Sequence, residues 1–262
     1  MILVILPVKN ESAHIKKTAL RLNLFLSQYL KEEFEILFID DGSTDDSFAK
    51  IREIGISHIQ CMRNYFDRGK GSALKAGFVL SNVVYRLEDN DIIIFMDGDG
   101  QIEPQEIRTF INLMQLYDSD VVIGNKRHTY SISNYGFIRS IVSSFYNLMA
   151  RVLFGIRFQD TQCGLKIFKK YALDQVIEKI TVKKFAFDLE LLVALREMKM
   201  RVADAPITIG RQENAGSVSL KNIWQTFTDT IGIYRKMLKG FYKTERVYHG
   251  KSNLRYTANK KR

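Results

Sequence analysis

The sequence has little cysteine and little proline. Its 262 residues include two cysteines, three prolines and 16 glycines, and 46% of them are hydrophobic. Cys61 and Cys163 are too few for a disulfide framework or a thiolate metal site, and they favour a reducing compartment. The low proline and glycine content, with 11% aromatic residues, excludes a collagen-like, coiled-coil or disordered chain. We therefore expect a folded protein with a sizeable hydrophobic core.

Long apolar runs are also missing. The longest, such as Met1–Leu6 and Ile92–Met96, are far shorter than the roughly 18–20 residues that a membrane-spanning helix needs. Met1–Leu6 has no basic segment before it and is followed directly by Pro7, Lys9 and Asn10. This run predicts a first β-strand and not a signal peptide, and we expect no segment that is integral to a membrane.

Positive charge is concentrated at one end of the chain. The formal net charge is +10, of which the last 20 residues carry +6 and the other 242 carry +4. A basic tail suits an anionic partner such as a lipid surface or a nucleic acid, or else it is a solubilising end. We expect one domain over residues 1–240 and a basic tail over 241–262, which holds Lys243, Arg246, Lys251, Arg255, Lys260, Lys261 and Arg262.

Short apolar runs alternate with longer amphipathic stretches in the first half. Such strands, apolar on both faces and alternating with helices, predict an α/β fold with a mostly parallel, twisted, Rossmann-like sheet and helices on both faces. In such folds the ligand lies at the carboxyl ends of the strands. The predicted strands are Ile2–Leu6, Glu35–Ile39, His58–Met62, Ile92–Met96 and Val121–Ile123, and the predicted helices are Ala13–Tyr29, Asp45–Glu53, Gly71–Leu80 and Pro104–Leu116.

The second half is less regular, and it shows neither a repeat nor a linker. Its last predicted helix carries apolar side chains along one side, including Trp224, and we expect that side to pack against the core. The predicted helices are Phe137–Phe154, Phe187–Met198 and Leu220–Phe241, and the predicted strands are Lys166–Phe168 and Val202–Ala205.

Three of the predicted strands are followed by polar, mostly acidic segments. These are Pro7-Val8-Lys9-Asn10-Glu11, Asp40-Asp41-Gly42-Ser43-Thr44-Asp45 and Asp97-Gly98-Asp99-Gly100-Gln101. One acidic turn is common, since aspartate forms turns and Ser43 or Thr44 is suited to cap the second helix. Acidic groups that converge from several strands on one sheet edge need a cation or hydrogen-bond donors to offset their repulsion.

Asp97, Asp99 and Gln101 form the strongest motif. Three oxygen-bearing side chains, two residues apart after a buried strand, suit a hard divalent cation such as Mg²⁺ or Mn²⁺. Such a site uses one or two carboxylates and completes its coordination with substrate phosphates and water. A calcium-binding EF-hand is excluded, because its sixth position is Ile102 and its twelfth is Arg108. The alternative is a purely structural turn.

Two phosphate-binding motifs are incomplete. Gly69-Lys70-Gly71-Ser72 looks like part of a P-loop, yet Asn64 replaces the leading glycine and Gly71 stands at the Ser/Thr position. The dinucleotide-binding pattern at Gly98-x-Gly100 fails at its third glycine, where Glu103 stands. Arg68 and Lys70 still place two cations at a predicted helix start, which suits either an anion contact or a simple turn.

Taken in order along the chain, these motifs resemble the family 2 glycosyltransferases of GT-A fold. The segments are Pro7-x-x-Asn10-Glu11, Asp40-Asp41-Gly42-Ser43-x-Asp45, Gly69-Lys70-Gly71 and Asp97-x-Asp99-x-Gln101. The second half is similar to the dolichyl-phosphate glucosyltransferases and, almost as closely, to the mannosyltransferases of the same branch. The segments that carry this similarity are Asp160-Thr161-Gln162-Cys163-Gly164-Leu165-Lys166-Ile167-Phe168 and Phe185-Ala186-Phe187-Asp188-x-Glu190-Leu191-Leu192.

The resemblance, which covers about residues 2–240, implies a role for each matching residue. It implies that Asp97, Asp99 and Gln101 lie at a Mg²⁺ or Mn²⁺ ion, which neutralises charge on the departing nucleoside diphosphate. The implied residues for the nucleotide-sugar donor are Pro7, Asn10, Glu11, Asp40, Asp41, Lys70 and Asp97. The implied residues for the acceptor phosphate are Arg127, Arg139, Ser143 and Arg211, and arginine suits that task because its planar fork binds phosphate oxygens in pairs.

The implied activity is that of an inverting glycosyltransferase, which moves a hexose from UDP-glucose or GDP-mannose to a polyprenyl (dolichyl-type) phosphate. A sugar hydroxyl acceptor must lose a proton during attack and needs a positioned base. A lipid phosphate is already anionic near neutral pH, so orientation and charge suffice. Asp188 is accordingly a positioning residue for a lipid acceptor, the base for a hydroxyl acceptor, or merely the cap of the helix that follows.

A lipid acceptor has to be reached from a membrane surface. The predicted helix Phe137–Phe154 has a broad apolar face, interrupted by Arg139 and Arg151, which suits either the core or a bilayer interface. The basic tail adds attraction to anionic lipid. We therefore expect a cytoplasmic protein, peripherally associated with the cytoplasmic face of a membrane directly or through a separate membrane partner, and no nucleic-acid partner.

Two other classes of function stay open on the sequence alone. Asp97-x-Asp99 after a strand also resembles the nucleophile motif of haloacid-dehalogenase phosphohydrolases, although Gln101 replaces the usual Thr or Val. No convincing downstream acidic motif accompanies it. The other class is a non-catalytic binding module that brings a basic tail to a membrane complex.

Overall fold

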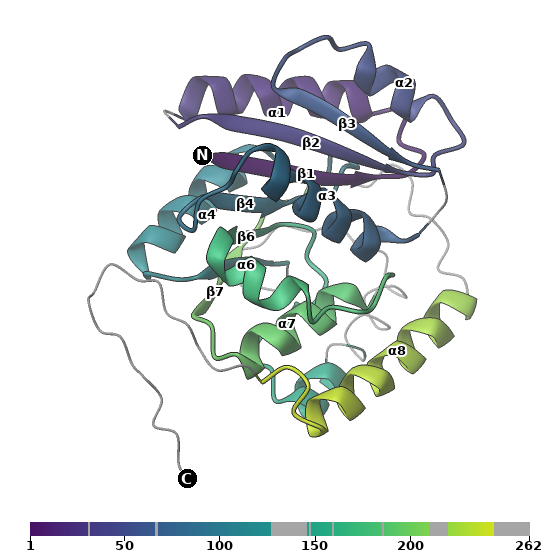
Figure 1. Ribbon diagram of the computed structural model, residues 1–262, viewed down its shortest axis with the longest axis vertical. Helices are drawn as coiled ribbons and strands as arrows, with labels where there is room; N and C mark the ends of the chain where they lie inside the picture. The colour runs from purple at the N-terminus through teal and green to yellow at the C-terminus, as the bar shows by residue number, and fades with distance from the viewer. Residues whose placement is uncertain are drawn as a thin grey trace.

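A seven-stranded sheet forms the centre of the protein (Figure 1). The computed structural model describes residues 1–30, 32–65, 68–126, 146, 148–158, 160–184, 186–209 and 220–243, with side chains from residue 224 in the last range. The strand order is β3-β2-β1-β4-β6-β5-β7. The strands are β1 Ile2–Val8, β2 Phe34–Asp41, β3 Ile59–Asn64, β4 Ile92–Phe95, β5 Val121–Asn125, β6 Lys166–Lys169 and β7 Val202–Pro206.

The sheet is mostly parallel. β1 pairs in parallel with β2 and β4, β2 with β3, and β5 with β7, whereas β6 runs antiparallel between β4 and β5. The carboxyl ends of β1, β2, β4 and β5 therefore lie at one edge of the sheet, and β6 begins at that edge. We call it the carboxyl edge. The predicted α/β sheet is confirmed.

Helices cover both faces of the sheet (Figure 1). They are α1 Ile15–Tyr29, α2 Ser47–Arg52, α3 Lys70–Val84, α4 Gln105–Leu116, α6 Lys170–Ile177, α7 Phe187–Glu197 and α8 Leu220–Leu238. Leu3 and Ile5 of β1 belong to a buried cluster with residues of α3, α6 and α7, while Val4 and Leu6 belong to a second cluster with residues of α1 and α4. Alternate side chains of one strand thus support two helical layers.

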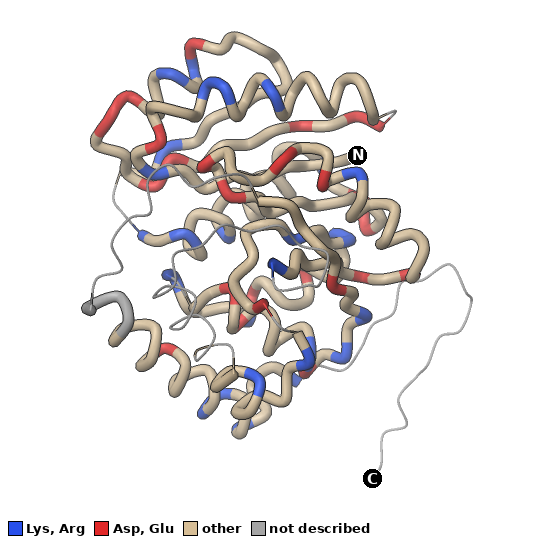
Figure 2. The backbone as a smooth tube through the Cα atoms, turned by 180° about the vertical axis from the view of Figure 1, so that it is seen from behind, with Lys and Arg blue, Asp and Glu red and all other residues tan. Residues whose placement is uncertain are grey.

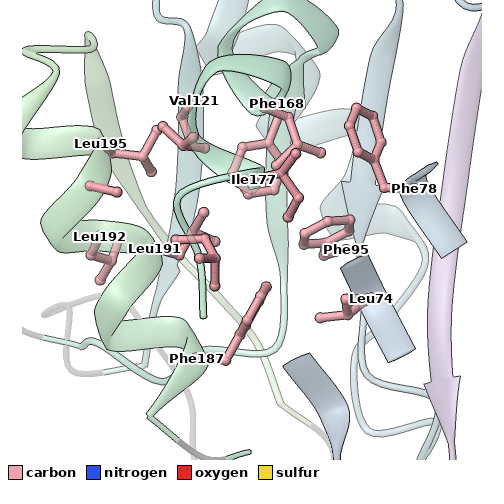
Figure 3. Close-up of a cluster of buried hydrophobic side chains, with 14 of the residues drawn as sticks. Leu74, Phe78, Phe95, Val121, Phe168, Ile177, Phe187, Leu191, Leu192 and Leu195 are labelled. Atoms are coloured by element: carbon pink, nitrogen blue, oxygen red, sulfur yellow. The ribbon is translucent and has the colours of Figure 1, made fainter. Parts of the chain in front are cut away.

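Aromatic side chains join α3 and α7 to the central strands (Figure 3). The ring of Phe95 in β4 lies 5.1 Å from that of Phe168 in β6 and 6.5 Å from that of Phe187 in α7, centroid to centroid. Phe187 also lies against Gly71 of α3, where an added Cβ would stand 2.5 Å from its ring. These contacts fix the first turns of both helices at the end of β4.

The predicted elements of the first half are all present, with ends shifted by a few residues. In the second half α6 was missed, since it follows β6 without a break. Of the predicted helix Phe137–Phe154, the structure describes residue 146 and residues 148–154, which are helical, and the remainder lies outside the described residues. None of the helices in the described ranges is long and apolar enough to cross a membrane.

α8 packs on the rest of the protein through one of two apolar sides. Ile233 is buried and the ring of Tyr234 lies 5.9 Å from that of Phe154. Trp224, in contrast, is 69% exposed. The prediction that Trp224 packs against the core is wrong, because the side that carries it points away from the core that holds Ile233.

A buried carboxylate fastens α8 to α7. Glu190 accepts hydrogen bonds from the backbone N–H groups of Thr181 (2.8 Å) and Val182 (2.7 Å). The hydroxyl of Tyr242 donates to it at 2.8 Å, and Lys236 of α8 forms an ion pair with it at 2.9 Å. Burial alone would raise the pKa of Glu190, but these donors hold the pKa below its ordinary value.

Replacing Glu190 by glutamine should make the stability of the protein depend less on pH in the acid range. A carboxyl group with a lower pKa in the folded than in the unfolded protein adds stability above its unfolded pKa, about 4.3 for glutamate, and loses it as the pH falls through the folded pKa. We expect the thermal midpoint of the wild type to fall more steeply than that of Glu190→Gln below about pH 5. Circular dichroism melts at each pH measure this, and parallel profiles would contradict it.

Candidate functional site

The loops that follow β1 and β2 are tied together at the carboxyl edge. Asn10 donates its backbone N–H to Ser43 Oγ (3.0 Å) and accepts the backbone N–H of Thr44 at its side-chain oxygen (2.8 Å). Glu11 donates its backbone N–H to Ser47 Oγ (2.8 Å). Asn10 has a φ of 56°, a left-handed conformation that asparagine tolerates better than most residues. The two loops therefore form one preformed wall of the site.

Asp40 and Asp41 end β2, and both are buried. Asp40 pairs with Arg63 Nε at 3.2 Å and accepts the backbone N–H of Ser43 at 3.1 Å. Asp41 accepts the backbone N–H groups of Arg68 (3.1 Å) and Gly69 (2.7 Å). Asp40 thus holds the loop after β2, and Asp41 holds the start of α3.

Three carboxylates share a partly buried region at the end of β4. Asp99 accepts the backbone N–H and the side-chain amide of Gln101 at 3.1 and 2.8 Å. Burial raises the pKa of Asp99, and the neighbouring Asp97 raises it further. Burial also raises the pKa of Glu11, with Asp99 adding to the effect. Their mutual repulsion means that this region favours a positive charge.

Lys70, in the first turn of α3, supplies one such charge. Its Nζ lies 2.7 Å from Asp97 Oδ1 and 3.4 Å from Asp188 Oδ2. Asp188 Oδ1 in turn lies 2.7 Å from Nζ of Lys166. Negative and positive groups therefore alternate through Asp97, Lys70, Asp188 and Lys166. We call these four residues the charge chain.

The inner half of the charge chain is buried. Burial alone would raise the pKa of Asp188, but the ammonium groups of Lys166 and Lys70 lower it. Lys166 is also buried and donates to the backbone carbonyl of Cys163 at 2.5 Å. A carboxylate engaged by two lysines is a weak base, so this geometry favours a positioning role for Asp188.

The segment before β6 lies against Asp97. Asp97 donates its backbone N–H to the carbonyl of Gly164 at 3.2 Å. A Cβ at Gly164 would stand 1.9 Å from Asp97 Oδ2, so only glycine leaves room for this carboxylate. Cys163 packs against Gly124, and burial raises the pKa of its thiol to about 11. Cys163 is therefore a packing residue.

The donor-side and metal-side residues predicted from the sequence all lie at the carboxyl edge, in strand ends, loops and helix starts. They are Pro7, Asn10, Glu11, Asp40, Asp41, Lys70, Asp97, Asp99, Gln101 and Asp188. The predicted acceptor-phosphate residues Arg127, Arg139, Ser143 and Arg211 lie outside the described residues. Lys166 was missed as a site residue. The available signal was a lysine inside an otherwise apolar predicted strand.

The chemistry of the edge suits a hard metal ion with few protein ligands. In the ranges that the structure describes, no group of three or more His, Cys, Asp and Glu side chains is arranged to hold a metal. Asp97, Asp99 and Gln101 offer oxygen donors only, as Mg²⁺ and Mn²⁺ prefer. Burial raises the pKa of Asp99 and the neighbouring Asp97 raises it further, and a cation beside the pair would offset their repulsion. The residues thus fit an ion that completes its coordination with phosphate oxygens and water.

A mostly parallel sheet with an Asp-x-Asp-x-Gln motif at its carboxyl edge defines a glycosyltransferase of the GT-A class. Residues 3–177, more than half of the chain, match the family described as "Glycosyl transferase family 2". The chain belongs to this family.

Several curated relatives align with most of the chain. "Dolichyl-phosphate beta-glucosyltransferase" of Dictyostelium discoideum is 25% identical over 255 residues, which cover 92% of this chain and 76% of that protein. The protein of the same name from Saccharomyces cerevisiae is 26% identical over 227 residues, 78% of this chain and 65% of its own length. "Undecaprenyl-phosphate 4-deoxy-4-formamido-L-arabinose transferase" of Proteus mirabilis is 28% identical over 209 residues, 77% of this chain and 59% of its own length.

A solved structure shares the fold. Glucosyl-3-phosphoglycerate synthase from Mycobacterium tuberculosis, in complex with Mn²⁺, uridine-diphosphate-glucose and phosphoglyceric acid, matches with a TM-score of 0.63 and 16% identity. The match covers 94% of this chain and 81% of that one. At this identity the match is evidence of the fold alone, and it confirms the predicted GT-A fold.

Replacing Gly164 by alanine should disturb the predicted metal-binding residue Asp97. The new methyl group would overlap the Asp97 carboxylate, so the carboxylate or the start of β6 must shift. We expect binding of Mn²⁺ together with a nucleoside diphosphate to weaken at least about tenfold, measured by titration calorimetry. Gly232→Ala is the matched control, because nothing lies within 4 Å of its added Cβ. Equal binding by both variants would contradict the geometry.

Lys166→Met and Lys166→Arg should separate the contribution of the Lys166 charge to stability from the contribution of its packing. Removing the ammonium group leaves the buried Asp188 with Lys70 alone, and we expect a loss of about 3 kcal/mol of unfolding free energy, the low end of the range for broken buried pairs. Lys166→Arg keeps the positive charge and should recover much of that loss. Urea denaturation measures both, and equal stability of the two variants would show that the charge is unimportant.

Proposed function

We propose that this chain is a metal-dependent, inverting hexosyltransferase that moves a hexose from UDP-glucose or GDP-mannose to a polyprenyl phosphate. The observation that carries the proposal is the meeting of Glu11, Asp97 and Asp99 with Lys70 at the carboxyl edge. Repelling carboxylates beside an ammonium group suit a divalent cation bound together with a diphosphate. The acceptor class is supported by the relatives named for dolichyl and undecaprenyl phosphate.

Lys70 acts on the donor diphosphate beside the residues that would hold a metal. Asp97, Asp99 and Gln101 would hold a Mg²⁺ or Mn²⁺ ion, which would supply positive charge for the leaving nucleoside diphosphate. Burial alone would lower the pKa of Lys70, but Asp188 and Asp97 raise it above its ordinary value, so Lys70 stays protonated. Because both carboxylates hold its Nζ before a donor arrives, Lys70 needs little reorganisation to meet the developing charge.

The nucleoside part of the donor binds against the loops after β1 and β2. The candidate residues are Pro7, Asn10, Glu11, Asp40 and Asp41. Hydrogen bonds already join these loops to one another and to the start of α3. A wall that is formed in advance lowers the entropy lost when the donor binds.

The acceptor phosphate attacks the anomeric carbon of the hexose. A new bond forms between this carbon and a phosphate oxygen while the bond to the donor diphosphate breaks, and the electron pair leaves with the nucleoside diphosphate. Attack from the opposite face inverts the configuration. The acceptor oxygen carries no proton to remove, so Asp188 positions Lys70 and does not act as a base. Arg127, Arg139, Ser143 and Arg211 are the candidates that hold the acceptor phosphate.

The proposed place of action is the cytoplasmic face of a membrane, reached peripherally or through a separate membrane partner. One observation and the proposed acceptor support it. Cys61 and Cys163 are both free, as expected in a reducing compartment. The proposed acceptor is a lipid, which the enzyme has to meet at a bilayer surface.

A transfer assay tests the proposed reaction. Polyprenyl phosphate is offered with Mg²⁺ or Mn²⁺ and, in turn, UDP-glucose, GDP-mannose or UDP-N-acetylglucosamine, and the lipid fraction is read by mass spectrometry. A glycosylated lipid phosphate from one donor supports the proposal and identifies the sugar. Metal-dependent donor hydrolysis without a lipid product would point to a sugar hydroxyl acceptor. No turnover of any donor would favour the binding module.

Asp99→Ala should abolish transfer without unfolding the protein. We expect transfer to fall at least about hundredfold, because the variant lacks a ligand of the ion that offsets leaving-group charge. The thermal midpoint without metal should not fall, since the folded protein disfavours the charge of Asp99. Asp174→Ala, on α6 and paired with Lys170 one turn before it, is the control and should keep full activity. Transfer activity retained by Asp99→Ala would contradict the proposed mechanism.

A further inference from the structure

α8 has an outer apolar side that nothing in the described ranges covers. Its inner side packs against the core through Ile233, Tyr234 and Met237. Residues spaced three, four or seven apart lie on one side of a helix. The outer side follows that spacing with Trp224, Phe227, Ile231 and Leu238, which are 69%, 42%, 37% and 67% exposed. We call these four residues the outer α8 face.

The outer α8 face groups four exposed apolar side chains on one side of a helix, whereas the exposed apolar residues normal at protein surfaces are scattered singly. The rings of Trp224 and Phe227 lie 6.1 Å apart, so the aromatic end of the face is continuous. The helix lies at the edge of the molecule, away from the sheet (Figure 1). Exposed apolar and aromatic side chains that form a stripe mark an interaction surface.

Basic side chains border this face. Residues 224–243 contain four basic residues and one acidic residue, Asp229. Arg235 is exposed and lies one turn from both Ile231 and Leu238, and Lys239, the residue after the helix, is exposed as well. Lysine and arginine gather around the lower end of the molecule, where α8 ends (Figure 2). The surface is therefore apolar along its centre and positive at its border.

We propose that the outer α8 face inserts into the surface of a lipid bilayer that contains anionic lipid. Aromatic and apolar side chains on one face with basic residues beside them are the pattern of a helix that lies in the membrane interface. A second copy of the chain fits less well, because it would bring another basic border and not the anionic groups that this border attracts. The inference rests on the proposed function, whose acceptor is a membrane lipid.

The connection from α8 to the carboxyl edge is short. Lys236 of α8 pairs with Glu190, which also binds the backbone just before Lys183. The carbonyl of Lys183 accepts the backbone N–H of Ser72 at 3.2 Å, two residues after Lys70. A bilayer that is held by α8 would therefore have a fixed position relative to the site that contains Lys70.

Trp224 allows a direct test, because it is the only tryptophan in the chain. The full chain is mixed with vesicles of phosphatidylcholine alone and with vesicles that also contain phosphatidylglycerol. With the anionic vesicles we expect a blue shift of the tryptophan emission and protection from acrylamide quenching, both reversed by high salt. With phosphatidylcholine alone the emission should change little. The donor plays no part, so this test and the transfer assay fail independently.

Variants of the apolar residues and of the basic residues separate their contributions to vesicle binding. Phe227→Glu should weaken binding to the anionic vesicles at least about tenfold, since it removes a large apolar contact. The double variant Arg235→Gln, Lys239→Gln should also weaken it about tenfold or more, without changing stability. Val83→Glu on α3 is the matched control, because Val83 is 76% exposed and lies on a different surface. It should bind as the wild type does.

Three results would overturn the proposal. The first is sedimentation with anionic vesicles while Trp224 emission stays unchanged, which would place the contact elsewhere in the chain. The second is a Trp224 that acrylamide cannot reach in the monomer without vesicles, which would show that the chain itself covers the face. The third is protection that depends on protein concentration alone, which would make a second copy the occupant.

Discussion

The ammonium group of Lys70 is shared between Asp97 and Asp188, and the arrangement of the site depends on this contact. It joins residues that follow β4, begin α3 and begin α7, three places far apart in the sequence. One positive charge between two carboxylates offsets the repulsion that the acidic loop after β4 would otherwise suffer. Lys166 adds a second positive charge, which pairs with the other carboxylate oxygen of Asp188.

Close packing around the charge chain keeps its members in place. Phe187 presses against Gly71, so the first turns of α7 and α3 keep a fixed separation. Asp41 holds the backbone just before Lys70, and Gly164 leaves room for the carboxylate of Asp97. The same rigid frame extends to α8 through Glu190, which links the proposed catalytic and membrane-facing parts of the chain.

The sequence predicted the mostly parallel sheet and the acidic segments at its carboxyl edge, because both follow from local patterns. Apolar runs identify buried strands, and the acidic segments after them lie at one edge in any parallel sheet. The partnership of Lys70 with Asp188 was not predictable, since it joins residues 118 positions apart. Trp224 was misplaced because a helix with two apolar sides gives no indication of which side meets the core. The acceptor-side residues rest on the family resemblance alone.

The most direct measurement is a crystal structure of the chain with Mn²⁺ and UDP or GDP. The account predicts an anomalous manganese signal at the side chain of Asp99 and a diphosphate oxygen within hydrogen-bonding distance of Lys70 Nζ. It also predicts that the nucleoside lies against the loops after β1 and β2. A nucleotide bound away from the carboxyl edge, or a Lys70 that turns away from the diphosphate, would contradict it.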